Sequence, residues 1–160
     1  VTRNLRFLRY HKKTSLTLVS ISMRHKFPYI KTGLWYRPII SISLKHNKKE
    51  LNYLALLDSG ADFNILHGEI AKILGIDLTK LKSIKFQGIK KGAEGIGYIT
   101  EVEVGINHVF HKTMVVFSND ISENGYGILG QQGFFSNYKA HFLYRDIEVI
   151  LEDEEQLGKN

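Results

Sequence analysis

The stretch Leu56-Leu57-Asp58-Ser59-Gly60-Ala61-Asp62 decides how the rest of the chain is interpreted. The apolar run at residues 51–57 predicts a buried strand that leads directly into the carboxylate of Asp58. A carboxylate in that place is unfavourable unless it is hydrogen-bonded or paired. Ser59 supplies a hydroxyl, and Gly60 permits a tight turn that brings a backbone N–H to the carboxylate. The stretch therefore predicts a structured loop built around an acidic side chain.

A single carboxylate held in this way can bind a cation or a substrate. Two copies brought together by two-fold symmetry would instead form an acid–base pair. Like charges about 3 Å apart cannot both ionise, so such a pair shares one proton. One carboxylate can then take a proton from a water molecule while the other polarises a carbonyl group. The chemistry of the stretch therefore depends on whether a second carboxylate meets Asp58.

The residues on either side predict short strands joined by polar turns. Apolar and polar residues alternate at 39–44 and 98–104, as in half-buried strands. The expected strands are residues 39–44, 51–57, 63–66, 84–86, 98–104, 109–117, 140–144 and 147–151. One short helix is expected at 69–74, where Gly75 provides a stop, and a helical turn at 133–138. Short strands at this spacing with one clear helix predict an all-β fold, a barrel or a sandwich.

The net charge of +6 is concentrated at the start of the 160-residue chain. Residues 1–26 hold seven of the 22 basic residues and none of the 16 acidic ones, so the remainder has a net charge of −1. We therefore predict a poorly ordered basic N-terminal extension at 1–26, a single domain at 27–151 and an acidic tail at 152–160. For the extension, a disordered arm, a secretory signal, a transit peptide and a natural start at Met23 all stay open.

Composition excludes several kinds of site. The chain has no Cys, which excludes disulfides and Cys-ligated metal centres and fits a cytoplasmic location. No apolar run approaches the ~20 residues that span a bilayer, so no membrane span is expected. His108 and His111 would point to opposite faces of a strand, which argues against a shared metal ion. The glycine-rich segment 88–97 lacks the pattern of a phosphate loop, and the near-neutral body argues against a nucleic-acid partner.

Three elements in order resemble the retropepsin-type aspartic proteases. The run from Ala55 to Asp62 is similar to the active-site loop of that family. Ile128-Leu129-Gly130, about 70 residues further on, is similar to the element that packs beneath the loop. The glycine-rich segment between them, FQGIKKGAEGIGY, is where the family has its flap. The resemblance spans roughly residues 35–151, and Gly133-Phe134-Phe135 is similar to the small bacterial members.

This resemblance implies a retropepsin-like half-barrel subunit with one short helix, completed as a homodimer. It implies an aspartic endopeptidase that hydrolyses polypeptide substrates without a metal or other cofactor. The catalytic residue would be Asp58, one from each subunit. The residues that support its loop would be Ser59, Gly60 and Ala61. The residues that contact substrate would be Asp62, Gly88 and Ile89.

Two departures from the family pattern favour an alternative. Gln131 stands where retroviral members commonly have an Arg that pairs with the second Asp of the loop. The flap segment also carries Lys90, Lys91 and Glu94. The alternative is a module of the same fold that dimerises or binds peptides without efficient proteolysis. A third hypothesis is a nucleic-acid or membrane-surface protein that acts through residues 1–26.

Overall fold

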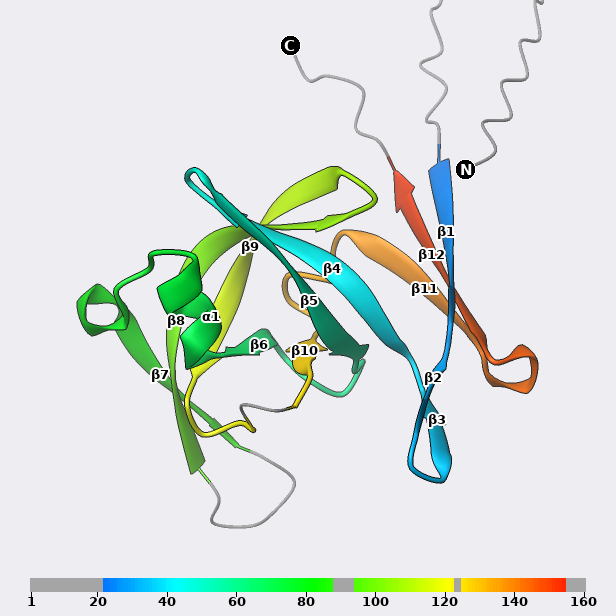
Figure 1. The fold of residues 1–160 in the computed structure, drawn as a ribbon, viewed down its shortest axis with the longest axis horizontal. Helices are drawn as coiled ribbons and strands as arrows, with labels where there is room; N and C mark the ends of the chain where they lie inside the picture. Colours follow the sequence, from blue (N-terminus) through cyan, green and yellow to red (C-terminus); the bar gives the residue numbers. More distant parts are fainter. Residues whose placement is uncertain (1–21, 88–93, 123–124, 155–160) are drawn as a thin grey trace, which may run out of the picture.

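The computed structural model describes residues 22–87, 94–122 and 125–154. Strands dominate these residues, together with one α-helix and two short 3-10 helices (Figure 1). The strands are β1 (Ser22–Pro28), β2 (Ile30–Thr32), β3 (Trp35–Arg37), β4 (Ile39–His46), β5 (Lys49–Leu57), β6 (Asn64–His67), β7 (Lys82–Gln87), β8 (Glu94–Ile106), β9 (Val109–Ser118), β10 (Gly127–Leu129), β11 (Tyr138–Leu143) and β12 (Glu148–Glu154). The helices are α1 (Gly68–Ile73), η1 (Leu78–Lys80) and η2 (Tyr144–Asp146).

Seven strands form the body of the molecule, in the order β4-β5-β10-β6-β9-β8-β7. An additional pairing of β4 with β8 curls this sheet into a barrel (Figure 1). The short strand β10 lies between β5 and β6, parallel to β5 and antiparallel to β6. The expected all-β fold with one short α-helix is therefore confirmed, and it is a barrel rather than a sandwich.

Alternation along the strands produces the core. Ile40, Ile42 and Leu44 on β4 are buried, whereas Ser41 between them is exposed, as the period of two in a strand requires. The inward residues meet the buried side chain of Phe117 from β9 and of Leu129 from β10 in one continuous cluster. The core therefore holds β10, and with it the segment that follows β5, in a fixed place.

The helix α1 covers one side of the barrel near its predicted position. It begins after His67, whose Nδ1 accepts a hydrogen bond from the Glu69 N–H at 3.2 Å. Ile70 and Ala71 face the core. The helix ends before Gly75, whose φ of 75° is a left-handed conformation that favours glycine. None of the helices in the described part of the chain has the length and apolar composition needed to cross a membrane.

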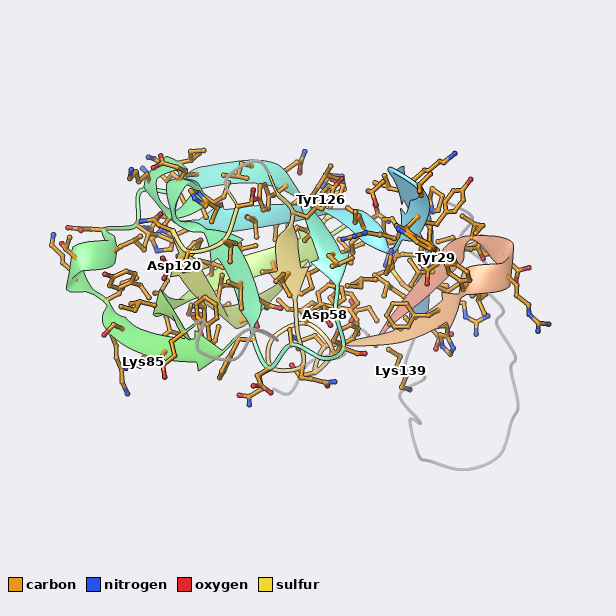
Figure 2. The ribbon with its side chains drawn as sticks, turned by 90° about the horizontal axis from the view of Figure 1, so that it is seen from below. Tyr29, Asp58, Lys85, Asp120, Tyr126 and Lys139 are labelled. Atoms are coloured by element: carbon orange, nitrogen blue, oxygen red, sulfur yellow. The ribbon has the colours of Figure 1, made fainter. Side chains whose placement is uncertain are left out.

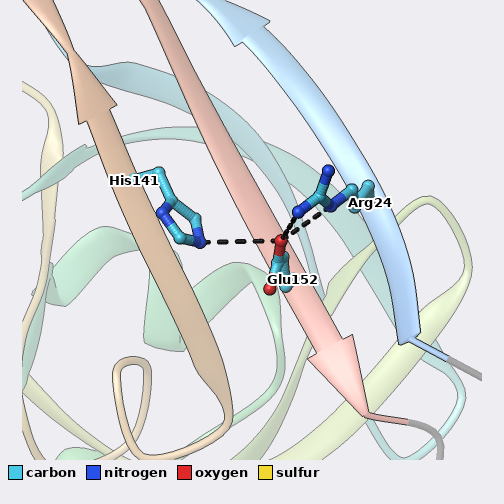
Figure 3. A network of polar contacts seen from close by, with 3 residues as sticks. All are labelled: Arg24, His141 and Glu152. Carbon is cyan, nitrogen blue, oxygen red and sulfur yellow. Dashed lines mark hydrogen bonds and ion pairs between the residues drawn. The ribbon is translucent and has the colours of Figure 1, made fainter.

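A separate three-stranded sheet, with the order β1-β12-β11, joins the two ends of the described chain and is here called the terminal sheet. The boundaries expected after residues 26 and 151 fall inside its paired strands, so residues 22–26 are part of an ordered strand. The physical reason is that the whole of β1 pairs with β12, and that its basic side chains face acidic ones: Arg24 donates to Glu152 at 2.7 Å, and Lys26 contacts Glu148 at 3.2 Å. Figure 3 shows the first of these contacts. Residues 1–21 and 155–160 lie outside the described residues.

Two further features differ from the expectation. Strands β2 and β3 form a hairpin that the sequence did not predict, with Gly33 in its turn at a φ of 62°. Leu34 and Trp35 of this hairpin are 86% and 65% exposed. Residues 133–137 form turns in which the N–H groups of Asn137 and Tyr138 donate to the Phe134 carbonyl, as in the expected helical turn, but β11 begins at Tyr138, two residues before the expected strand.

Candidate active site

Asp58 lies directly after β5, where the strand leaves the barrel, and its side chain is half-buried (Figure 2). The Gly60 N–H donates to Oδ1 of Asp58 at 2.9 Å, and the Ala61 N–H donates to the Asp58 carbonyl at 3.1 Å. The Asp58 N–H donates in turn to the Leu129 carbonyl of β10 at 3.0 Å. The turn that the Asp-Ser-Gly tripeptide predicts is therefore present, and it is tied to a neighbouring strand.

The segment after β10 braces this loop from below. A Cβ atom on Gly130 would lie 2.4 Å from the Phe63 carbonyl oxygen and 2.7 Å from that of Ala61, so only glycine fits. The Gln131 N–H donates to the Ala61 carbonyl at 2.8 Å. The Gln132 N–H donates in the same way to the carbonyl of the next loop residue, Asp62. Residues 128–130 and the Asp58 loop therefore form one unit, although about 70 residues separate them in the sequence.

Gln131 stabilises the loop through its side chain as well. Its Nε2 donates to the Ser59 carbonyl at 2.6 Å. Gln131 stands where the retroviral members commonly have an Arg that forms an ion pair with the loop. Its neutral amide binds the loop by a hydrogen bond instead. The amide holds the backbone of Ser59 rather than the carboxylate of Asp62.

Asn64 is a positioning residue that the sequence analysis missed. Its side chain is fully buried, and its Oδ1 accepts a hydrogen bond from the Gly130 N–H at 3.0 Å. Its Nδ2 donates to the Met114 carbonyl at 3.4 Å. Asn64 thus links the start of β6 to the end of β10 and to β9. The available signal was an amide between the apolar residues Phe63 and Ile65, because a buried polar group must be hydrogen-bonded.

The electrostatic setting of the loop is simple. Asp58 and Asp62 have no ion-pair partner within residues 22–87, 94–122 and 125–154, and Asp62 is exposed. Ser59 and Gly60 are exposed and Ala61 is half-buried. On β5 itself, burial raises the pKa of Tyr53. The loop therefore presents carboxylates that no basic side chain of the described residues neutralises.

The hairpin of β7 and β8 is anchored by an ion pair and by hydrogen bonds to the end of β9. Lys85 and Glu94 form an ion pair of 3.0 Å across its stem, where Gln87 pairs with Glu94. Further along β8, Oδ2 of Asp120 accepts from the Ile96 N–H at 2.7 Å, and Ser118 donates to the carbonyl of the same residue at 2.6 Å. Figure 2 labels Lys85 and Asp120.

These contacts connect the stem to the segment after β9, which sequence reasoning did not foresee. The predicted flap residues Gly88 and Ile89 lie outside the described residues.

The two histidines considered for a metal ion do not face one another. His108 lies in the turn before β9 at a φ of 71°, whereas His111 lies on β9 and contacts Asp153 at 3.2 Å. Across the described ranges, no group of three or more His, Asp or Glu residues is arranged to hold a metal ion.

Comparison with solved structures identifies similar folds. A retropepsin-like aspartic protease from Rickettsia conorii superposes with a TM-score of 0.59 at 18% identity, over 84% of this chain and 95% of that one. The EIAV protease in an inhibitor complex matches with a TM-score of 0.41 at 22% identity, over 63% of this chain and 88% of that one. No family model matches the sequence, and no curated protein matches it. The match to the Rickettsia conorii protein, at a TM-score above 0.5, shows that the chain has a retropepsin-like fold, as the sequence resemblance predicted.

Proposed function

We propose that this chain is an aspartic endopeptidase that becomes active when two copies bring their Asp58 side chains together. The observation that carries the proposal is the geometry of the Asp58 loop on a retropepsin-like fold. Asp58 is half-buried, and one of its oxygens is held by the Gly60 N–H. The backbone is fixed before it by Leu129 of β10 and after it by Gln131. A catalytic carboxylate needs this kind of rigid support, because small displacements of a reacting group reduce the rate strongly.

The reaction follows from the properties of a carboxylate pair. Two carboxylates in contact share one proton, so one is a base and the other an acid. The base takes a proton from a water molecule as the oxygen of that water attacks the peptide carbonyl carbon. The acid donates its proton to the carbonyl oxygen as that oxygen gains charge. Collapse of the resulting tetrahedral species with proton transfer to the amide nitrogen breaks the C–N bond, with no covalent enzyme intermediate.

Exposed apolar surface supports the proposed second copy. The β2–β3 hairpin projects from the body of the molecule (Figure 1), and its residues Leu34 and Trp35 are exposed. An isolated two-stranded hairpin is only marginally stable in water, and large exposed apolar groups commonly mark association surfaces. We propose that the partner subunit covers this hairpin.

The remaining loop residues have supporting roles in this proposal. Ser59, Gly60 and Ala61 shape the turn, and Gln131 holds it through the Ser59 carbonyl. Asp62 lies in the same loop as Asp58 and is exposed, and we propose that it binds the substrate backbone. Gly88 and Ile89 are proposed to contact substrate from the β7–β8 hairpin.

A peptide-library digestion tests the proposal. The wild-type chain and two variants, Asp58→Asn and Asp62→Asn, are first shown to be dimers by sedimentation and then compared. We expect Asp58→Asn to reduce kcat by at least about 10²-fold, as loss of general acid–base catalysis does. Asp62→Asn is the matched control: the same chemical change in the same loop should raise KM and largely preserve kcat.

Two outcomes contradict the proposal. A confirmed dimer that cleaves no peptide between about pH 4 and 7 would favour the binding module of the same fold. A chain that stays monomeric at every concentration tested would remove the second carboxylate and with it the mechanism.

A further inference from the structure

The inner face of the terminal sheet carries an unusual row of polar side chains. Tyr138 of β11 is directly opposite Asp153 of β12, and His25 of β1 is opposite Leu151, two residues earlier on the same face. Leu151 and Val149 are fully buried against the barrel. Polar residues that share a face with such neighbours are also turned toward the barrel. The terminal sheet therefore meets the barrel through a polar patch at one end of an apolar interface.

Asp153 is at the centre of this patch. It is 1% exposed, and its Oδ2 lies 3.2 Å from Nε2 of His111 on β9. The His111 ring packs edge-on against Tyr138, with ring centroids 5.1 Å apart. A buried carboxylate with few hydrogen bonds is costly, so its neighbours determine how well the two parts of the molecule fit together.

His25 joins the patch from β1. Its Nδ1 lies 2.8 Å from the Asn107 side-chain nitrogen, in the turn between β8 and β9. Because an amide nitrogen can only donate, Nδ1 accepts and the proton of the neutral ring lies on Nε2. That Nε2 is buried on the other side of the ring.

Three buried polar atoms of this patch have no hydrogen-bond partner within the described part of the chain. They are Nε2 of His25, the hydroxyl oxygen of Tyr138 and Oδ1 of Asp153. Two of the groups donate and the third accepts, and buried polar groups of this kind are normally satisfied. Burial raises the pKa of Tyr138, and the charge of Asp153 adds to that effect. Burial lowers the pKa of His25, and the charge of Asp153 partly offsets that effect.

The other charged residues of the terminal sheet do not belong to this patch. By strand alternation they lie on the outer face. Those whose side chains the structure describes are Arg24, Lys26, Lys139, His141, Glu148 and Glu152. The groups that face Asp153 are thus His25 from β1, His111 from β9 and Tyr138 from β11.

We propose that His25, His111, Tyr138 and Asp153 form a proton-sensitive clasp that holds the terminal sheet on the barrel at neutral pH and releases β1 in acid. A proton added to Nδ1 of His25 removes the acceptor that Asn107 uses. It also places a positive charge on a half-buried ring, where the cost of burial exceeds the attraction of Asp153. The released strand exposes His25 to water, where the ring binds its proton without that penalty. The clasp is independent of whether the chain cleaves peptides.

Amide hydrogen exchange tests the clasp. Protection of the β1 amides, corrected for intrinsic exchange, is measured on the full chain at about pH 7.5 and about pH 5.5, which bracket histidine titration. We expect protection in β1 to fall with acid by up to about tenfold per pH unit, the limit for uptake of one proton. Protection in the barrel strands should change little.

Two variants locate the effect. His25→Gln keeps a neutral donor and cannot take up the proton, so the pH dependence in β1 should disappear. His141→Gln makes the same change on the outer face of the sheet, beside Glu152, and should retain the wild-type pH dependence. A fall in protection that survives in His25→Gln, or that disappears in His141→Gln, overturns the proposal.

A measurement on the wild-type chain covers the case in which His25→Gln does not fold. The His25 ring is followed by NMR through the same pH range. Its protonation should coincide with the loss of protection in β1. A ring that titrates while β1 stays fully protected contradicts the clasp.

Discussion

Glu152 and Asp153 are neighbours on β12, yet they lie on opposite faces of the terminal sheet and in opposite environments. Glu152 faces outward, where its Oε1 accepts from Nε of Arg24 at 2.7 Å and lies 3.6 Å from Nε2 of His141 (Figure 3). Asp153 faces the barrel with His111 and with polar atoms that lack partners among the described residues. Each acid thus has a histidine, but only the outer one also has an arginine. The comparison teaches that the contribution of an ion pair to folding stability depends more on its burial than on the type of contact.

The largest expected difference between the two faces concerns apolar side chains. Leu151→Ala should reduce the free energy of unfolding by about 2–5 kcal/mol, because it leaves a cavity at a fully buried position. Ile150→Ala removes a similar group from the outer, half-buried face and should have a clearly smaller effect. Urea unfolding of both variants measures the difference. Equal losses would mean that the terminal sheet does not dock on the barrel as described.

A smaller difference is expected for the two acids. Asp153→Ala removes the contact that His111 Nε2 makes with a buried carboxylate, and we expect a loss of about 1–3 kcal/mol in the free energy of unfolding. Glu152→Ala exposes its partners to water, which replaces the lost contacts, so its loss should be smaller. The same unfolding assay measures both. A more stable Asp153→Ala would show that the buried carboxylate opposes folding.

The smallest effect on stability is expected from removing the Arg24–Glu152 contact, which lies on the outer face of the terminal sheet. The hydrogen bond from Arg24 holds the pKa of Glu152 below its usual value of 4.5. This contribution is therefore present above about pH 4.5 and is lost as the pH falls through the lower pKa of the folded state. Arg24→Met should remove it, and salt near 1 M should abolish most of the difference from wild type. Thermal unfolding at low and high salt measures it, and a difference that persists in high salt contradicts a surface ion pair.

Local patterns were sufficient to predict much of the fold. Alternation at residues 39–44 and the stop at Gly75 each depend on neighbours within a few residues, so the strand and the helix could be placed from the sequence. The Asp58 turn is local in the same sense, since the Gly60 N–H binds a carboxylate two residues away.

Contacts between distant residues could not be predicted in this way. Arg24 and Glu152 are 128 positions apart, and considering the charge of each chain end separately hid their pairing. The roles of Asn64 and Gln131 depend on β10 lying between β5 and β6, which no local pattern reveals. The hairpin at Trp35 is short and exposed, so it leaves no periodic signal.

The position of β10 also sets a time order for assembly. Strands β5 and β6 follow one another in the chain but flank β10, so their loop waits for a segment about 70 residues further on. Pairing across such a separation is slow, and during synthesis it begins only after residue 129 has left the ribosome. A nascent chain that ends before β10 has the acidic tripeptide but no finished loop around it. The contacts that hold the Asp58 loop can therefore form only after residues up to Gln131 have been made.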